Sequence, residues 1–90
     1  MSKTVWKFEL ETADEQVIRV PQGAQFLKLD VQYGNPVCWM LVDSDNAKAD
    51  FKIRIVGTGN PANIGNTYVY LDTYQMSGGA LVFHAFGKWV

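Results

Sequence analysis

Residues 25–36 decide the fold of this chain, and they read Gln25-Phe26-Leu27-Lys28-Leu29-Asp30-Val31-Gln32-Tyr33-Gly34-Asn35-Pro36. Apolar and polar residues alternate in the first nine, with Leu27, Leu29, Val31 and Tyr33 set against Lys28, Asp30 and Gln32. This period of two is typical of a half-buried strand. Gly34-Asn35-Pro36 supplies turn chemistry, and an apolar run follows at residues 37–42. The segment therefore predicts a β-hairpin.

The same alternation recurs on both sides of this hairpin. It predicts strands at residues 5–10 and 16–20 upstream, and at residues 51–55, 68–76 and 80–86 downstream. No convincing amphipathic helix interrupts them. About seven short strands without helices predict an all-β fold, a small antiparallel β-sandwich or barrel.

Length and composition predict one domain that spans residues 1–90. The chain has 90 residues, of which 48% are hydrophobic and 19% charged. A domain this short buries a smaller fraction of its unfolded surface than a longer one, so its hydrophobic core contributes little stability. Eight basic residues stand against nine acidic ones, which argues against general nucleic-acid binding. The N-terminus lacks the apolar stretch of a signal peptide or membrane span, so we expect a soluble, cytoplasmic protein without membrane contact.

The residues that usually build metal and catalytic centres are scarce. Cys38 and His84 are the only cysteine and histidine, so an internal disulfide and a four-ligand zinc site are excluded. We expect Cys38 to be a buried thiol in a reducing compartment. The Asp43, Asp45, Asn46 and Asp50 cluster lacks the spacing of a calcium loop. No metal, cofactor or catalytic residue is predicted.

Two predicted strands, at residues 37–42 and 80–86, are apolar on both faces. Such strands need cover on both sides, and a two-layer domain of this size has few positions that are covered twice. We therefore expect a homo-oligomer, most simply a two-fold dimer, with contacts from residues 68–74 and 81–86.

The glycine-rich loop Gly57-Thr58-Gly59-Asn60-Pro61 is the first candidate binding element. Its successive backbone amides could form an anion-binding nest, with hydrogen bonds from Thr58 and Asn60 and charge from Arg54, as would suit a phosphate. The alternative is a plain turn that needs glycine, because the helix that follows a dinucleotide fingerprint is missing.

Aromatic residues and the single histidine form the second candidate. Tyr68, Tyr70 and Tyr74 fall at period two, where they could stack flat rings or instead form core or subunit interface. His84 has apolar neighbours and no adjacent carboxylate or serine, so it is either a satisfied buried histidine or a donor lining a pocket.

Several short segments in a fixed order carry a family resemblance: Val5-Trp6-Lys7-Phe8, Asp14-Glu15-Gln16, Pro21-Gln22-Gly23-Ala24, Trp39-Met40-Leu41-Val42-Asp43, Gly57-Thr58-Gly59-Asn60-Pro61 and Gly78-Gly79-Ala80-Leu81-Val82-Phe83-His84. Together they resemble a family of short, uncharacterised bacteriophage-encoded proteins across nearly the whole chain. In that family the position of Asn60 is commonly histidine. The resemblance implies a phage origin and a compact β-domain, and it implies no activity. The location that we expect for the protein is the cytoplasm of the host cell.

These observations favour a non-enzymatic function. The expectation is a phage accessory protein that sequesters a host-derived small molecule, such as a nucleotide-type defence signal, or blocks a host defence protein. The expected ligand-binding residues are Arg54, Gly57, Thr58, Gly59, Asn60, Tyr70, Tyr74 and His84, in a pocket that subunits could share. The alternative is a structural or assembly module of a phage particle.

Overall fold

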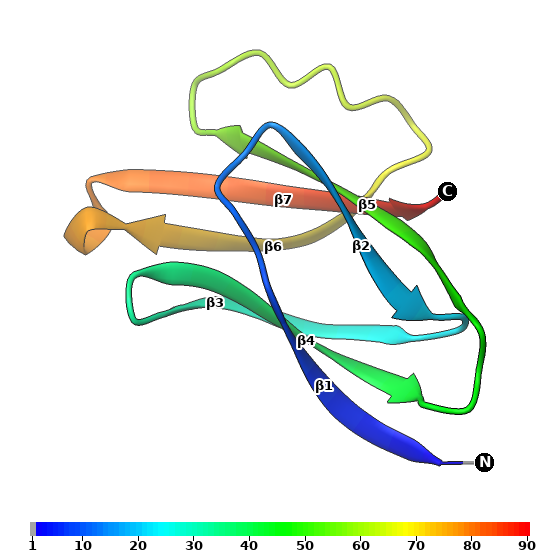
Figure 1. Ribbon diagram of the computed structural model, residues 1–90. Helices are drawn as coiled ribbons and strands as arrows, with labels where there is room; N and C mark the ends of the chain where they lie inside the picture. The colour runs from blue at the N-terminus through cyan, green and yellow to red at the C-terminus, as the bar shows by residue number, and fades with distance from the viewer. Residues whose placement is uncertain (1) are drawn as a thin grey trace.

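The computed structural model describes residues 2–90, which form seven antiparallel strands (Figure 1). The strands are β1 (Lys3–Glu9), β2 (Glu15–Pro21), β3 (Gln25–Gln32), β4 (Asn35–Asp43), β5 (Lys48–Gly57), β6 (Val69–Met76) and β7 (Leu81–Trp89). A single 3-10 turn, η1 (Ser77–Gly79), joins β6 to β7. The prediction of an all-β fold of about seven strands is confirmed.

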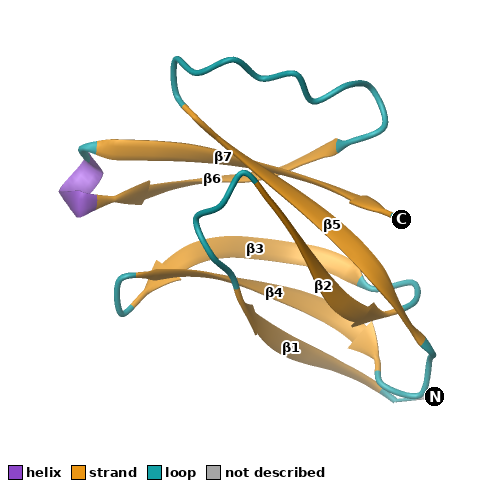
Figure 2. Ribbon diagram, turned by 45° about the horizontal axis from the view of Figure 1, so that its top comes forward, coloured by secondary structure: helices purple, strands orange, loops and turns teal. Residues whose placement is uncertain are grey.

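The strands form two sheets, ordered β1-β4-β3 and β2-β5-β7-β6, which lie one above the other (Figure 2). Edge strands β3 and β6 approach each other on one side, where the Leu29 amide donates a hydrogen bond to Asp72 Oδ2 at 3.0 Å. The ladders described for residues 2–90 do not join these two strands. The arrangement is therefore a sandwich and not a closed barrel.

The core lies between the sheets and is supplied mainly by their central strands. Cys38, Met40 and Val42 of β4 face Ile53 and Ile55 of β5, and all five are almost fully buried. The period of two explains this, because alternate residues of a strand point to the same face. Aromatic residues of β1 and β7, among them Trp6, Phe8 and Phe83, pack around the edge of the core.

The outer faces of β4 and β7 are only partly covered. On β4, Val37 is buried, whereas Trp39 and Leu41 are half-buried on the face that points away from the other sheet. On β7, His84 and Phe86 are half-buried in the same way. The apolar pattern of these strands therefore leaves side chains that one copy of the chain does not fully cover.

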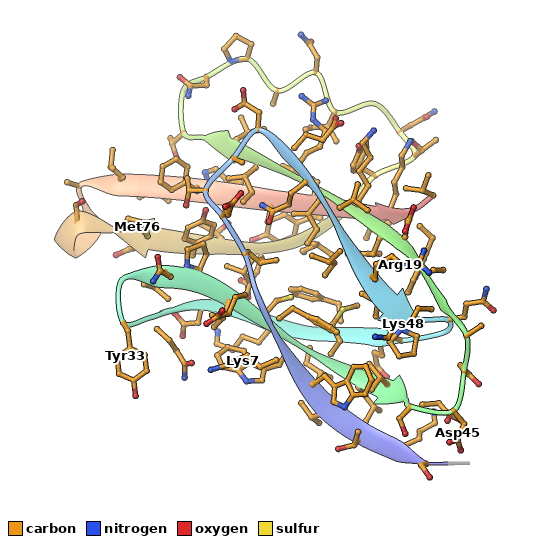
Figure 3. The ribbon with its side chains drawn as sticks, in the orientation of Figure 1. Lys7, Arg19, Tyr33, Asp45, Lys48 and Met76 are labelled. Carbon is orange, nitrogen blue, oxygen red and sulfur yellow. The ribbon has the colours of Figure 1, made fainter. Side chains whose placement is uncertain are left out.

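The β3–β4 hairpin turns at Tyr33-Gly34, one residue earlier than the Gly34-Asn35-Pro36 turn that the sequence predicts. Both turn residues have positive φ, 51° at Tyr33 and 81° at Gly34, as the two-residue type I′ hairpin turn requires. Tyr33 is 97% exposed and projects from the tip of the hairpin, away from the core (Figure 3). Its expected place on the apolar face of the strand was wrong.

A β-bulge between Phe26 and Lys28 also changes which side of β3 is buried. Because the bulge inserts one extra residue, Phe26 packs on the core and Leu27 is 45% exposed. Beyond the bulge the predicted alternation holds, since Leu29 is buried and Val31 packs against the core.

The strained turn residue offers a way to stabilise the protein. A tyrosine with positive φ is unfavourable by about 1–2 kcal/mol, whereas asparagine tolerates this backbone conformation. We expect Tyr33→Asn to raise the free energy of unfolding by about 1 kcal/mol and the melting temperature by about 4–8 °C. Thermal denaturation followed by circular dichroism measures this. Tyr33→Phe keeps the strain and should give no gain, so equal melting temperatures for the two variants would contradict the turn assignment.

Candidate functional site

Outward-facing residues of β5 and β7 form the base of the candidate site. In the antiparallel register Arg54 pairs with Phe86 and Val56 with His84. The residues between them, such as Ile55 and Ala85, are buried in the core, so these four point to the outer face of the second sheet. The loop that leaves β5 and returns at β6 starts beside them (Figure 1).

A continuous chain of hydrogen bonds crosses this outer face. The His84 ring contacts a threonine hydroxyl at each nitrogen, Thr58 Oγ1 at 2.7 Å from Nε2 and Thr73 Oγ1 at 2.9 Å from Nδ1. Thr73 Oγ1 lies 2.6 Å from the hydroxyl of Tyr70, and Thr58 Oγ1 donates to the carbonyl of Val82 at 3.3 Å. Residues from the β5–β6 loop, β6 and β7 are thereby connected.

The number of hydrogens available limits the directions that these bonds can take. One arrangement of hydrogens satisfies every contact: Thr58 gives its hydroxyl hydrogen to the Val82 carbonyl, and His84 donates to Thr58 from Nε2. In neutral His84, Nδ1 then accepts from Thr73, and Thr73 accepts from Tyr70. Tyr70 is 55% exposed, so in this arrangement the lone pairs of its hydroxyl can accept a hydrogen bond from an incoming group.

The glycine-rich loop forms a turn and not a row of free amides. Asn60 N–H donates to the Gly57 carbonyl at 3.1 Å, and Gly59 has a φ of 88°, which is the geometry of a tight turn that favours glycine at this position. The Thr58 amide donates to the Val82 carbonyl at 3.0 Å. Two of the amides expected to bind an anion are thus bonded within the protein, which favours the plain-turn interpretation.

A small pocket of about 210 Å³ lies between this turn and β7. The residues that line it come from the end of β5, the turn and β7: Val56, Gly57, Thr58, Gly59, Asn60, Ala62, His84 and Phe86. Beside the pocket, Tyr70 packs on Phe86 in an edge-to-face contact with ring centroids 5.8 Å apart. A hydrogen-bonding pocket and an exposed aromatic surface therefore adjoin each other.

Arg54 lies next to the pocket but is engaged by its own loop. Its Nη1 donates to the carbonyl of Asn63 at 2.9 Å, and its Nε lies 4.0 Å from Glu15 Oε2 without a hydrogen-bond partner in the described residues. It lines a neighbouring depression together with Gly57 and Asn60. Arg54 thus holds the loop and places positive charge at the edge of the site.

Tyr74 does not belong to the site, because it lies on the opposite face of β6 from Tyr70. A β-bulge between Tyr70 and Asp72 shifts the alternation, so that Tyr70 points outward and Tyr74 is only 3% exposed in the core. Its hydroxyl lies 2.9 Å from Thr12 Oγ1, and its ring packs on Phe83. Burial raises the pKa of Tyr74, while the hydrogen bond with Thr12 opposes this.

Most of the candidate residues nevertheless converge. Five line the pocket directly, namely Gly57, Thr58, Gly59, Asn60 and His84, and Tyr70 joins them through Thr73. Sequence reasoning missed Thr73 and Phe86, although both are site residues in this arrangement. Strict alternation would put Thr73 on the opposite face from Tyr70, and only the bulge brings the two hydroxyls together.

Two further properties concern metals and membranes. Within residues 2–90, no group of three or more His, Cys, Asp or Glu side chains is placed to hold a metal ion. The same residues include no helix with the length and apolar character needed to cross a membrane.

Comparison with known families matches the chain to a domain of unknown function (DUF7352) over residues 1–90. The chain therefore belongs to this family. The expected membership of an uncharacterised family is confirmed, and the match carries no information on a phage origin. Comparisons with curated proteins and with solved structures gave no match.

Proposed function

We propose that this member of the DUF7352 family is a non-enzymatic binding protein for a small planar molecule of the nucleotide type. The observation that carries the proposal is the hydrogen-bond chain from Tyr70 through Thr73 and His84 to Thr58, which ends beside a pocket. The flat ring of the ligand would stack on the Tyr70–Phe86 surface. An amino group on that ring would donate to the outward lone pairs of Tyr70.

The charge of this face suits the phosphate of such a ligand. Arg54 pairs in register with Phe86, and Lys88 lies two residues beyond Phe86 on the same face of β7. Phosphate groups are held well by guanidinium and ammonium groups at the edge of a site. The base and the phosphate of one nucleotide would thus meet separate parts of the same surface.

The surroundings of His84 favour binding over catalysis. Both ring nitrogens contact threonine hydroxyls, and neither bonds to a carboxylate in the described part of the chain. A nucleophile–base pair needs a base that accepts the nucleophile's proton and a third group that orients the base. Here neither ring nitrogen has a carboxylate that would orient His84 as a base toward the Thr58 hydroxyl.

The proposal extends to self-association and a cytoplasmic location. Val69, Tyr70 and Leu81 of β6 and β7 are among the most exposed large apolar residues of the described chain, and a second copy that covered them would also enclose the ligand. A phage accessory role in the host cytoplasm, directed against a small-molecule defence signal, is consistent with the buried free thiol of Cys38.

Titration with nucleotides tests the binding proposal. We expect AMP to shift the amide NMR signals of residues 57–60, Tyr70, His84 and Phe86, and adenosine to shift them at higher concentration because it lacks the phosphate. Tyr70→Ala should weaken AMP binding about five- to 150-fold, the loss expected when one stacking aromatic side chain is removed. Tyr70→Phe keeps the ring and should lose only the contribution of the hydroxyl.

Tyr33→Ala is the matched control, because Tyr33 is also an exposed tyrosine but lies on the distant β3–β4 hairpin. It should leave AMP affinity unchanged. Equal losses for the two alanine variants, or no signal shifts on β6 and β7 with any nucleotide, would contradict the proposal. Native mass spectrometry of the same mixtures gives the subunit number, and a ligand-free oligomer would favour an assembly role in a phage particle.

A further inference from the structure

The hydrogen-bonding role of the Tyr70 hydroxyl depends on His84, because Thr73 connects the two. Thr73 Oγ1 lies 2.6 Å from the Tyr70 hydroxyl and 2.9 Å from Nδ1 of His84. A hydroxyl group has a single hydrogen to donate. If Nδ1 accepts the Thr73 hydrogen, Tyr70 donates to Thr73, and if Nδ1 donates, Thr73 gives its own hydrogen to Tyr70. The state of His84 therefore sets the role of Tyr70.

Neutral His84 allows this chain of hydrogen bonds to run in either direction. In the arrangement described above, Thr73 donates to Nδ1 and Tyr70 donates to Thr73, so Tyr70 offers its lone pairs to a ligand. With the ring hydrogen on Nδ1 instead, Thr73 accepts from His84 and donates to Tyr70, whose hydrogen then points outward. This second arrangement gives up only the 3.3 Å hydroxyl contact from Thr58 to the Val82 carbonyl, which still accepts from the Thr58 amide at 3.0 Å.

Protonated His84 allows one direction only. Both nitrogens of a charged imidazole ring are donors, so Nε2 donates to Thr58 and Nδ1 donates to Thr73. Thr73 then gives its hydrogen to Tyr70, and the hydrogen of Tyr70 is directed away from Thr73 toward the ligand. That hydrogen suits a carbonyl oxygen on the ligand and opposes an amino group at the same place.

Uncharged side chains lie beside the His84 ring: Val56 of β5, Thr58 of the β5–β6 loop, Thr73 of β6 and Phe86 of β7. Charged side chains of the neighbouring strands have other partners: Arg54 bonds to the Asn63 carbonyl, Glu15 pairs with Lys52, Lys88 lies over the Tyr68 ring, and Asp72 accepts from the Leu29 and Thr73 amides. Asp14 lines the neighbouring depression with Arg54 and Val56. Within residues 2–90 no carboxylate bonds to the ring, so protonation acts on this chain through the two threonines.

We propose that Thr73 and His84 set which ring substituent Tyr70 recognises, and that protonation of His84 narrows this recognition from amino and carbonyl groups to carbonyl groups. This inference rests on the proposed function, because it concerns the same stacking surface of Tyr70 and Phe86. Thr73 is a positioning residue in this scheme, since it acts through the Tyr70 hydroxyl. AMP and IMP separate the two roles, because the ring of AMP carries an amino group where that of IMP carries a carbonyl group.

Calorimetric titration of the full chain with AMP and IMP, at about pH 7.5 and about pH 5.5, tests the proposal across the range in which histidine ordinarily changes its charge. We expect the ratio of the two affinities to move toward IMP at the lower pH by about two- to tenfold, the effect of one hydrogen bond. The ratio isolates this effect, because the charge of His84 and the titration of the phosphate act alike on both nucleotides.

Variants of Thr73 show whether the connection to His84 is the cause. Thr73→Val keeps the shape of the side chain but has no hydroxyl, so its affinity ratio should not change with pH. Thr73→Ser keeps the hydroxyl and should retain the shift, as should Thr4→Val, which makes the same change on an exposed threonine of β1. Melting temperatures show whether each variant is folded, and the wild-type ratio does not depend on them.

The outcomes distinguish this proposal from the one on which it rests. Binding of both nucleotides with a ratio that stays constant between the two pH values would overturn the role of His84 and leave the proposed function standing. A shift of equal size in folded Thr73→Val would show that the charge of His84 acts without Thr73, and would also overturn the proposal. If neither nucleotide binds at either pH, both proposals are wrong.

Discussion

Ile53→Ala is expected to lower the free energy of unfolding by about 2–5 kcal/mol, the range measured for large-to-small changes in a packed core. Ile53 is fully buried in the middle of β5, where it pairs with Gln16 of β2 and Gly87 of β7. The two sheets meet around this side chain, so little relaxation can fill the space that it leaves. The total free energy of unfolding of a protein domain is about 5–15 kcal/mol, so this substitution removes a large part of the stability.

Urea denaturation followed by tryptophan fluorescence measures the loss. Val17→Ala is the matched control, because Val17 also lies on a strand of the second sheet but is 52% exposed. It should change the free energy of unfolding by no more than about 0.5 kcal/mol. Similar losses for Ile53→Ala and Val17→Ala would mean that Ile53 is not at the centre of the core.

Alkaline pH is expected to destabilise the protein through Cys38. Burial raises the pKa of this thiol from its ordinary value of 9.0 to about 12. Above pH 9 the unfolded chain loses the thiol proton while the folded chain keeps it, so the unfolded state is favoured as the pH rises. Stability is unaffected below about pH 9 and falls between pH 9 and pH 12, by about 4 kcal/mol in all.

Urea denaturation at about pH 8 and about pH 11 measures the effect, with an expected loss of about 2–3 kcal/mol for the wild type from this thiol. Cys38→Ala removes the group, so its stability should fall less over the same interval, although it is lower at both pH values because of the cavity. Tyr74, whose pKa is also raised by burial, contributes a loss in the same direction to both proteins. Parallel pH profiles for the two proteins would exclude Cys38 as the cause.

The fold class could be predicted from the sequence because alternation marks strands well. Two of the misplaced residues share one physical cause, the insertion of an extra residue in an edge strand. Leu27 and Tyr74 both lie beside a β-bulge, and a bulge depends on the neighbouring strand and sheet. Tyr33 was misplaced for a different reason, because type I′ turns normally use asparagine or glycine at the position that this tyrosine occupies.

The candidate site could be predicted in part. Thr58 and His84 were selected for their chemistry, but only the register of β5 on β7 places these residues, 26 positions apart, within 2.7 Å of each other. The register between two strands cannot be predicted from the types of these residues or from their spacing in the sequence. The role of Thr73 could not be predicted from the sequence, because the bulge in β6 turns Thr73 outward and Tyr74 into the core.

The carboxylate of Asp72 also limits how this protein can polymerise. Exposed edge strands offer unpaired amides on which a foreign strand can assemble, and this is a common route to aggregation. At the β3 edge, the Leu29 amide is already occupied by Asp72, and β6 lies in the path of an incoming strand. The edges that stay open are β1 and β2, where the exposed charges of Lys3, Lys7 and Arg19 oppose the addition of another copy. Loss of the Asp72 carboxylate would therefore expose a third edge to edge-to-edge growth, and fibre formation by an Asp72 variant would begin at β3.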